Sequence, residues 1–328
     1  MNYHDVLKSF DNLRVLIVGD LMLDRYLTGR VSRISPEAPV PVIEWGGEED
    51  RLGGAANVAS NVKSLGAIPY LCGVVGQDAE GFRLMDLLSG AGLSSDGIIF
   101  SDERITTVKT RVIAGHQHLL RVDKENTANL SHSEQAAFLD RVMRLMEDWE
   151  FHALVFQDYD KGVLTKNVIT ELIMEAKKRG ILTAADPKYR NFWSYAGIDL
   201  FKPNLKEVQD ALRQKFEPEG HRLRVASETI REKLGNHLTL ITLSEKGVYL
   251  DNEHSWQLFP THPRNVADVC GAGDTVISIA ALALASGLGM EGIATLANLA
   301  GGQVVEKVGV VPVDKEQLKV ELERFVVH

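Results

Sequence analysis

Cysteine is nearly absent from this chain of 328 residues, which carries only Cys72 and Cys270. The two lie far apart in the sequence and form no CxxC pair, so the sequence predicts neither a disulfide framework nor a structural zinc site. A chain with so little cysteine is typical of a reducing compartment. We therefore expect a cytoplasmic protein.

Long apolar runs and basic blocks are missing as well. The longest apolar stretch, residues 276–285, is too short to cross a bilayer, and residues 1–11 lack the regions of a signal peptide. The formal net charge is -9 and no Lys/Arg-rich block occurs, which argues against nucleic acid or a membrane as the main partner. With 45% hydrophobic and 25% charged residues, the chain can bury a large core and stay soluble.

Apolar strands alternate with helical segments along most of the chain, which predicts a parallel sheet. Residues 13–18 form a continuous apolar run that ends at Gly19 and Asp20, as in a buried parallel strand with polar residues at its carboxyl end. Further strands are expected at 70–75, 153–157, 181–185, near 200 and at 238–242, and helices at 55–65, 81–88, from 131, at 166–178 and at 315–326. We expect one αβα domain over residues 1–328, although length alone also allows two.

Two segments, approximately 25–50 and 105–123, break this rhythm. Both alternate strand-like and polar residues, and Pro36, Pro39 and Pro41 exclude a central strand from the first. We expect the two segments to pair as a small β-sheet lid. Because an apolar two-part sheet cannot easily stand alone, we also expect the lid to pair with its copy in a homodimer.

Residues 268–275, Asp-Val-Cys-Gly-Ala-Gly-Asp-Thr, are typical of a phosphate-binding loop that opens a helix. Two glycines let the backbone turn, so the amides of Gly271, Ala272 and Gly273 can face an anion, and the helix dipole adds to the attraction. Asp274 would repel a phosphate, whereas taking a proton from an attacking hydroxyl suits it. Asp and Thr also favour helix starts, so the octapeptide alone leaves both interpretations open.

Other polar residues follow predicted strands. No GxxxxGK[ST] occurs, so a nucleotide would be bound without a P-loop, and the GxGxxG at 287–292 follows a helix and is interpreted as a turn. Asn204 and Glu207 could hold a hydrated magnesium ion or cap a helix. Residues 158–161 and 186–188 lie just past strands, at the edge where ligands bind, although surface turns would explain them as well.

Two stretches, Gly53-Gly54-Ala55-Ala56-Asn57 and residues 268–274, resemble in the right order the two signatures of the PfkB (ribokinase-like) carbohydrate kinases. The resemblance covers essentially the whole chain. Residues 19–26, 33–42 and 107–123 are most similar to the D-glycero-D-manno-heptose 7-phosphate kinases, which occur as free enzymes or as the kinase half of a bifunctional protein. The resemblance implies a ribokinase-like three-layer αβα sandwich with a mostly parallel central sheet and a β lid.

The resemblance also implies a reaction. Such a kinase uses ATP and Mg²⁺ to phosphorylate the anomeric hydroxyl of D-glycero-β-D-manno-heptose 7-phosphate, giving the 1,7-bisphosphate for lipopolysaccharide synthesis. A nucleotidyltransferase half would need more chain than these 328 residues. Ribose, fructose 6-phosphate or a nucleoside stay open as substrates. A catalytically silent sugar- or nucleotide-sensing module is the alternative of a different class, against which the intact Gly271, Gly273 and Asp274 argue.

Residue roles are carried over from the family by position. Asp274 matches the catalytic base, and the amides of Gly271, Ala272 and Gly273 match the anion hole. The positions where the family holds the sugar hydroxyls are Asp20, Asp24, Gly53, Gly54 and Asn57. The phosphate of the sugar should need a cation or two, and the candidates, chosen because they lie on the lid or on strand-end loops, are Arg111, Lys161, Lys188, Lys109 and Arg33. The residues expected at ATP are Asn204, Ser244, Lys246, Gly247, Gly271, Gly273 and Asn298, with Gly302 and Val305 on the adenine side, and Asn204 and Glu207 are expected at magnesium through water.

Two positions depart from the family pattern. Asp160 stands where a glycine commonly precedes Lys161 and Gly162, and Cys270 stands where threonine is common. These departures bear on the choice of sugar more than on the kinase chemistry.

Overall fold

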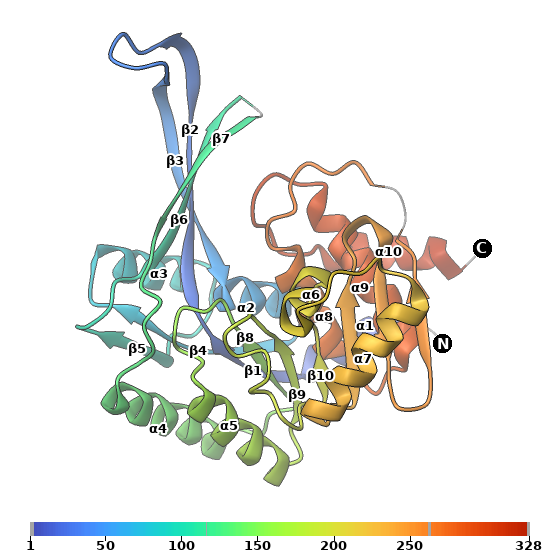
Figure 1. Ribbon diagram of the computed structural model, residues 1–328. Coiled ribbons are helices and arrows are strands. Elements are labelled where there is room, and N and C mark those ends of the chain that lie inside the picture. The colour runs from blue at the N-terminus through green and yellow to red at the C-terminus, as the bar shows by residue number, and fades with distance from the viewer. Residues whose placement is uncertain (1–2, 116, 262–263, 327–328) are drawn as a thin grey trace.

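The computed structural model describes residues 3–115, 117–261 and 264–326 (Figure 1). Its central element is a nine-stranded sheet in the order β13-β12-β11-β10-β9-β8-β1-β4-β5. The strands are β1 (Arg14–Gly19), β4 (Ile68–Gly76), β5 (Gly97–Ser101), β8 (Ala153–Gln157), β9 (Leu182–Asp186), β10 (Leu200–Phe201), β11 (Leu238–Thr242), β12 (Val248–Asp251) and β13 (Trp256–Phe259). The seven neighbouring strands β11, β10, β9, β8, β1, β4 and β5 pair in parallel. At the other edge, β12 and β13 pair in the antiparallel direction.

The register of the central strands brings three carboxyl ends together. Gly19 at the end of β1 pairs with Gln157 at the end of β8, and Gln157 pairs with Asp186 at the end of β9. A side chain at Gly19 would collide with the backbone of Gln157, so this close pairing requires glycine. The polar residues that end these strands therefore lie side by side at one edge of the sheet.

Helices cover both faces of the sheet, and β1 shows why. Its Val15 and Ile17 pack into one core and its Leu16 and Val18 into another, because successive strand residues point to opposite faces. The first core contains side chains from α1 (Tyr3–Ser9), α2 (Ala55–Ser64), α3 (Ala79–Gly90), α8 (Ala272–Ala285), α9 (Met290–Val305) and α10 (Lys315–Val326). The second contains side chains from α4 (His132–Asp148), α5 (Lys166–Lys178), α6 (Leu205–Leu212) and α7 (Gly220–Leu234). The expected three-layer αβα fold is confirmed.

Local signals in the sequence account for several boundaries. Ser131 and Glu134 form the predicted capping box of α4. The stretch 287–292 lies at the predicted turn between two helices, since α8 ends at Ala285, Gly287 has a φ of 75°, and residues 290–292 already belong to α9 (Met290–Val305). In the described part of the chain, no helix is long and apolar enough to cross a bilayer.

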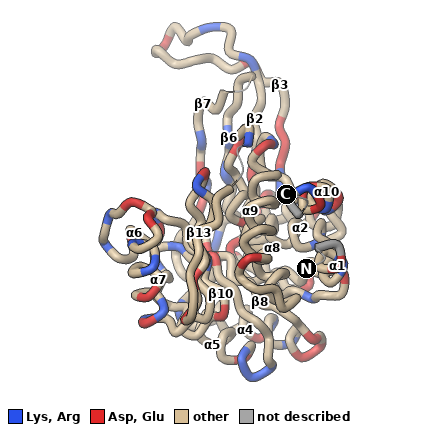
Figure 2. Tube along the Cα trace, turned by 90° about the vertical axis from the view of Figure 1, so that its right-hand side faces the viewer, with Lys and Arg blue, Asp and Glu red and all other residues tan. Residues whose placement is uncertain are grey.

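The lid is a second, four-stranded sheet in the order β3-β2-β6-β7. Its strands are β2 (Leu21–Ile34), β3 (Pro41–Gly54), β6 (Thr107–Ala114) and β7 (Gln117–Lys124), so both predicted segments take part in it. β2 and β3 form a long antiparallel arm that stands clear of the helical layers in two views at right angles (Figures 1 and 2). Pro36 and Pro39 lie at the tip of this arm and Pro41 opens β3, an edge strand, where a missing amide is tolerated.

Candidate active site

The predicted phosphate-binding loop turns into α8 at Gly271. This residue has a φ of 79°, and an added Cβ would lie 2.8 Å from Nδ2 of Asn57, so both the conformation and the contact require glycine. Asp268 holds the loop because its carboxylate accepts the amides of Cys270 and Gly309, each at 3.0 Å. The pKa of Asp268 is lowered by these hydrogen bonds, although burial acts in the opposite direction.

The loop leaves amides available to a ligand. Among the described residues, Ala272 donates its amide to the carbonyl of Val269 at a long 3.4 Å, and the amides of Gly271 and Gly273 have no acceptor. Unpaired amides at a helix N-terminus carry partial positive charge. The arrangement suits the developing charge of a transferring phosphoryl group.

Asp274 lies in the first turn of α8, and only 2% of its surface is exposed. Its Oδ2 accepts from Nδ2 of Asn57 at 2.8 Å, and its Oδ1 accepts from Nε2 of Gln157 at 3.0 Å and from the hydroxyl of Tyr159 at 2.7 Å. Burial raises the pKa of Asp274 to about 7, and the hydrogen bonds from Asn57 and Tyr159 oppose that rise. A carboxyl with a pKa near neutrality is suited to general-base catalysis.

The diglycine stretch delivers Asn57 to this carboxylate. Gly54 has a φ of 60° and turns the chain from β3 into α2, whose third residue is Asn57. Asn61, one turn later, donates to Asn57 Oδ1 at 3.2 Å and so orients its amide toward Asp274. The two stretches that carry the family resemblance therefore meet in one buried contact.

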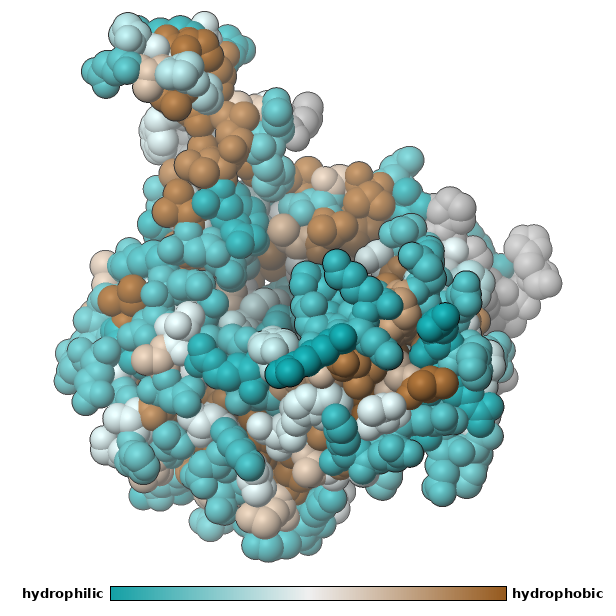
Figure 3. Space-filling model, in the orientation of Figure 1, coloured by the Kyte–Doolittle hydropathy of each residue, from teal (hydrophilic) through white to brown (hydrophobic). Residues whose placement is uncertain are grey.

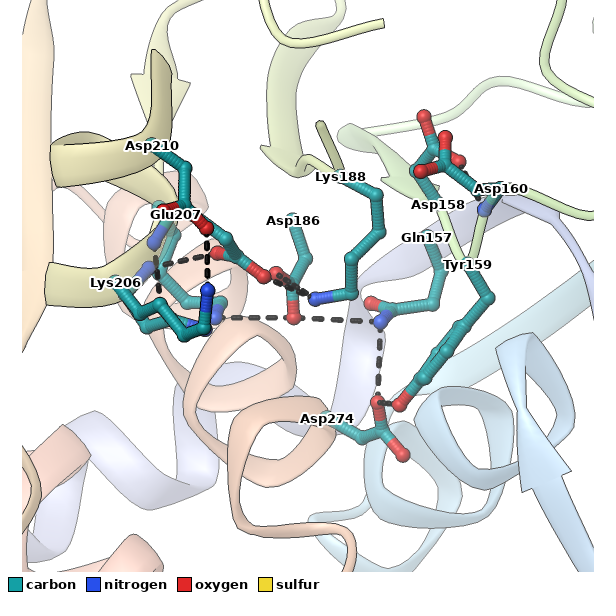
Figure 4. A network of polar contacts seen from close by, with 12 residues as sticks. Gln157, Asp158, Tyr159, Asp160, Asp186, Lys188, Lys206, Glu207, Asp210 and Asp274 are labelled. Carbon is teal, nitrogen blue, oxygen red and sulfur yellow. Dashed lines mark hydrogen bonds and ion pairs between the residues drawn. The ribbon is translucent and has the colours of Figure 1, made fainter. Parts of the chain in front are cut away.

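A network of alternating charges extends from Asp274 along the sheet edge (Figure 4). Gln157 Nε2 also donates to Asp186 Oδ2 at 3.3 Å, and Lys202 Nζ lies 3.0 Å from the same oxygen. Lys188 Nζ lies 3.9 Å from Asp186 and pairs with Glu207. Burial raises the pKa of Asp186, but the two lysines outweigh burial and hold it below its usual range. An added Cβ at Gly273 would lie 3.8 Å from Lys202 Nζ, so this lysine stands beside the phosphate-binding loop with an ionised partner.

Asp20, expected at the sugar, is buried beneath the loop that follows β8. Its carboxylate accepts the backbone amides of Tyr159, Lys161 and Val163 at 2.8, 3.1 and 3.2 Å. Burial raises the pKa of Asp20, and the three amides oppose that rise. In this arrangement Asp20 shapes the loop, and its contact with a sugar stays a prediction.

The same loop explains one departure from the family pattern. Asp160 has a φ of 56°, a left-handed conformation in which glycine is favoured and aspartate is tolerated. Gly162, two residues later, has a φ of 86°, and a side chain there would collide with the backbone of Ala128. The glycine that the resemblance led us to expect at position 160 would suit this backbone conformation.

At the base of the lid, Asp24 on β2 forms an ion pair with Arg111 on β6. Burial raises the pKa of Asp24, and the Arg111 guanidinium opposes that rise. A side chain at Gly53 would collide with the Asp24 carboxylate, so glycine is required there too. Three predicted substrate residues, each on a different lid strand, are therefore brought together at the base of the lid.

The other candidate cations are more dispersed. Lys161 Nζ lies 2.9 Å from Glu125, and Lys109 Nζ lies 3.5 Å from Asp123. Arg33 pairs with Val42 in the outer half of the β2–β3 arm, away from the strand ends that hold Asp274. The sequence ranked Arg33 with the other candidate cations, and only the structure shows that it lies away from the site.

The residues expected at the nucleotide converge from two directions. A short 3-10 helix begins at Ser244 and ends at Lys246. Gly247, which follows it with a φ of 92°, lies close to the carbonyl of Phe259. Asn298 on α9 donates to that same carbonyl at 3.1 Å. Farther along α9, a side chain at Gly302 would lie 3.0 Å from Arg264, and the carbonyl of Val305 accepts the amide of Asp268 at 3.1 Å.

Asn204 and Glu207 form a capping box at the start of α6, so the helix-cap interpretation is confirmed. Glu207 Oε2 accepts a hydrogen bond from the backbone amide of Asn204 at 2.8 Å. The other carboxylate oxygen of Glu207 pairs with Lys188. Within the described ranges, no group of three or more His, Cys, Asp or Glu side chains could hold a metal ion. A magnesium ion would fit here if it took most of its ligands from phosphate and water, and Glu207 would then hold one of those waters.

The sequence singled out neither Gln157 nor Lys202, and it placed Tyr159 and Asp186 at the edge where ligands bind, within 158–161 and 186–188, without an individual role for either. All four lie at or just after the carboxyl end of a strand, and that position is the signal for such residues. That signal fits surface turns equally well, and only the register of β8, β9 and β10 shows that these side chains converge.

Comparison with known proteins agrees with this geometry. The model of a family described as pfkB family carbohydrate kinase matches residues 12–316. A relative from Methylobacillus flagellatus, named bifunctional protein HldE, is 41% identical over 314 residues, covering 95% of this chain and 64% of that protein. The protein of the same name from Magnetococcus marinus is 40% identical, covering 96% and 65%. The chain thus spans somewhat less than two thirds of the length of these relatives.

Solved structures match the fold over nearly the full length. Escherichia coli phosphofructokinase-2 in complex with substrates and products superimposes with a TM-score of 0.78 at 19% identity, covering 95% of this chain and 100% of that one. Arabidopsis thaliana ribokinase complexed with ribose and ATP gives a TM-score of 0.71 at 19% identity, covering 94% and 98%. Both comparisons confirm the ribokinase-like fold.

Proposed function

Because the chain belongs to the pfkB family of carbohydrate kinases, we propose that it transfers the γ-phosphoryl group of ATP to a sugar hydroxyl with Asp274 as the base. The observation that carries this proposal is the buried Asp274 carboxylate, with a pKa of about 7. It follows Gly271 and Gly273, whose amides have no acceptor among the described residues. A base and an anion hole are the two parts that this transfer needs.

The proposed acceptor is the anomeric hydroxyl of D-glycero-β-D-manno-heptose 7-phosphate, and the product is the 1,7-bisphosphate. Its support is the resemblance of residues 19–26, 33–42 and 107–123 to heptose phosphate kinases, together with relatives about 40% identical that share the name of one bifunctional protein. The proposed cellular site is the cytoplasm, where ATP is available, and residues 1–328 are proposed to act as one kinase unit.

The chemistry follows from the positions of the side chains. The acceptor hydroxyl gives its proton to Asp274 while its oxygen forms a bond to the γ-phosphorus of ATP. The bond from that phosphorus to the bridging oxygen breaks, and its electron pair leaves with ADP. The amides of Gly271 and Gly273 stabilise the negative charge on the group in transit, and the charges of Lys188 and Lys202 act in the same direction.

Magnesium fits an outer position in this site. When bound with the phosphates, it would draw negative charge from their oxygens. Glu207 would hold its waters, and the Asn204 amide orients Glu207 for that role. Lys188, already paired with Glu207, would neutralise the neighbouring phosphate charge.

The sugar phosphate is proposed to lie between the base of the lid and Asp274. Asp24 would accept hydrogen bonds from sugar hydroxyls, and Gly53 and Gly54 would allow the sugar to approach the backbone closely. Arg111, Lys161 and Lys188 are the proposed cations for its phosphate, each of which now has a carboxylate partner. A phosphate group would have to share or replace those partners.

A homodimer through the lid is the proposed assembly. Large apolar side chains are exposed on its strands (Figure 3), among them Trp45 at 74%, Ile34 at 60% and Leu120 at 60% exposure. A sheet with such a face gains free energy by covering it. A second copy of the same lid offers a matching apolar surface.

ADP release tests the function. Purified protein with Mg-ATP is supplied in turn with D-glycero-β-D-manno-heptose 7-phosphate, ribose, fructose 6-phosphate and adenosine, and Asp274→Asn is the control. Turnover of the heptose alone, lost in Asp274→Asn, is expected. Turnover of a different acceptor would keep the kinase and overturn the substrate, whereas no turnover of any acceptor would favour a silent sensing module.

A further inference from the structure

The loop after β8 places a phenol directly on the proposed base. The Tyr159 hydroxyl donates to Oδ1 of Asp274 at 2.7 Å, the shortest of the three hydrogen bonds to that carboxylate in the described chain. Tyr159 comes from a different element than the two stretches that carry the family resemblance. The inference below rests on the proposed role of Asp274.

The two oxygens of Asp274 differ in what they can still accept. Among the residues that the structure describes, Oδ1 receives both the Tyr159 hydroxyl and the Gln157 side-chain amide, whereas Oδ2 receives only the Asn57 side-chain amide. A carboxylate oxygen has about two lone-pair sites, so Oδ1 is filled and Oδ2 keeps one. We propose that Tyr159 is a positioning residue that occupies Oδ1 and keeps the carboxylate ionised, so that the sugar proton passes to Oδ2.

Tyr159 is itself held in place from two sides. Its backbone amide donates to Asp20 at 2.8 Å, which anchors the loop to the end of β1. Lys188 Nζ lies 5.4 Å from the centre of its ring, within the range of a cation–π contact. Because both the backbone and the ring are restrained, the hydroxyl meets Asp274 in one geometry, and little entropy is lost when the substrate arrives.

The charges that face Asp274 explain why a hydrogen-bond donor is needed to keep its carboxylate ionised. Asp186 on β9 and Asp24 on β2 both disfavour ionisation of Asp274, in addition to its burial. Lys188 favours it, as do the hydrogen bonds from Asn57 and Tyr159. Without the Tyr159 hydroxyl, this balance moves toward the protonated acid. A hydrogen bond to a charged group corresponds to about one pKa unit.

The test compares two variants that each remove one phenol hydroxyl. Tyr159→Phe loses the contact with Asp274, and Tyr195→Phe loses a buried hydrogen bond of 2.9 Å to Asp158 in the same loop without touching Asp274. In Tyr159→Phe, the midpoint of the acidic limb in the pH profile of kcat/KM should shift to higher pH by about one unit. At pH 7 this shift lowers kcat/KM roughly fivefold, and above about pH 9 kcat/KM should return almost to the wild-type value. In Tyr195→Phe the limb should not move. A loss in Tyr159→Phe that is equal at every pH would overturn the proposal.

A second readout does not need turnover. Protein labelled with ¹³C at the aspartate carboxyl carbons is titrated by NMR, and the Asp274 resonance is assigned by its absence in Asp274→Asn. Its midpoint should lie near pH 7 in the wild type and about one unit higher in Tyr159→Phe. An unmoved midpoint would overturn the proposal even in an active enzyme. A moved midpoint in a protein that turns over no sugar would instead overturn the proposed function and leave the contact established.

Discussion

Asn57 in α2 and Asp274 in α8 lie 217 residues apart in the sequence and are joined by a hydrogen bond of 2.8 Å. Each belongs to one of the two stretches by which the family is recognised. The contact ties the diglycine turn to the proposed base, so a change in either stretch should alter the geometry of the other.

Replacement of the base should abolish most turnover. Asp274→Asn keeps the size of the side chain but removes the proton acceptor, and general-base catalysis contributes about 10²- to 10⁴-fold to such rates. We expect kcat to fall by that order while the sugar dissociation constant changes little, as measured by steady-state kinetics and calorimetry. The exposed Asp96→Asn is the matched control. A variant that retains a tenth or more of kcat would contradict the assignment of the base.

The wild-type rate should depend on pH near neutrality. Burial raises the pKa of Asp274 to about 7, and only the ionised carboxylate can accept the proton. We therefore expect kcat/KM to rise as the pH rises through about 7 and to fall tenfold per unit well below it. The profile is measured with saturating Mg-ATP between pH 5 and 9. A limb near pH 4, where an unperturbed aspartate titrates, would show that burial does not govern this group.

A methyl group at Gly271 should disrupt the site. An alanine Cβ there would lie 2.8 Å from Nδ2 of Asn57, in addition to the strain of a φ of 79°. Gly235→Ala is the matched control, because its φ is 64° and no atom of the described residues lies within 4 Å of its added Cβ. Both variants should lose about 1 kcal/mol of stability or more, but only Gly271→Ala should lose at least tenfold in kcat. Equal activity in the two variants would rule out the coupling between Gly271 and Asn57.

The role of Asp20 can be separated into stability and binding. Its carboxylate accepts three backbone amides of the loop after β8, and hydrogen bonds to a buried charged group are worth about 1.5 to 3 kcal/mol. Asp20→Asn should therefore lower the free energy of unfolding by an amount of that order, measured by urea denaturation. If Asp20 also contacts the sugar, KM should rise in the same variant. Unchanged stability would mean that the three amides do not depend on its charge.

The exposed apolar face of the lid predicts a dimer that charged substitutions on this face should dissociate. Ile34→Glu with Trp45→Glu places charges on the exposed apolar face, where the two side chains are 60% and 74% exposed. The wild type should sediment as a dimer and the double variant as a monomer with an unchanged circular dichroism spectrum. Met174→Glu on α5, 46% exposed, is the control that should stay dimeric. A monomeric wild type would reject the proposed assembly.

Local sequence patterns predicted most of the secondary structure that builds the site. The strand at 153–157 and the helix at 166–178 have the expected bounds, since continuous apolar runs and helical spacing are visible within each segment. The antiparallel edge strands β12 and β13 and the helix α7 were not predicted. Each edge strand has only four residues, which is too short for a clear apolar pattern. The helix α7 carries many charged residues on its exposed side, and these weaken its apolar pattern.

The sequence by itself determined the order of most strands and helices, the glycines that must adopt a left-handed turn, and the aspartate that follows them. These features depend on backbone sterics and on the spacing of apolar residues over a few positions. Only the tertiary structure decided that Gln157, Tyr159 and Asn57 share the Asp274 carboxylate, and that Asp20 turns toward a loop. Those contacts depend on the register of parallel strands and on the packing of α2 against α8, which bring together residues more than a hundred positions apart.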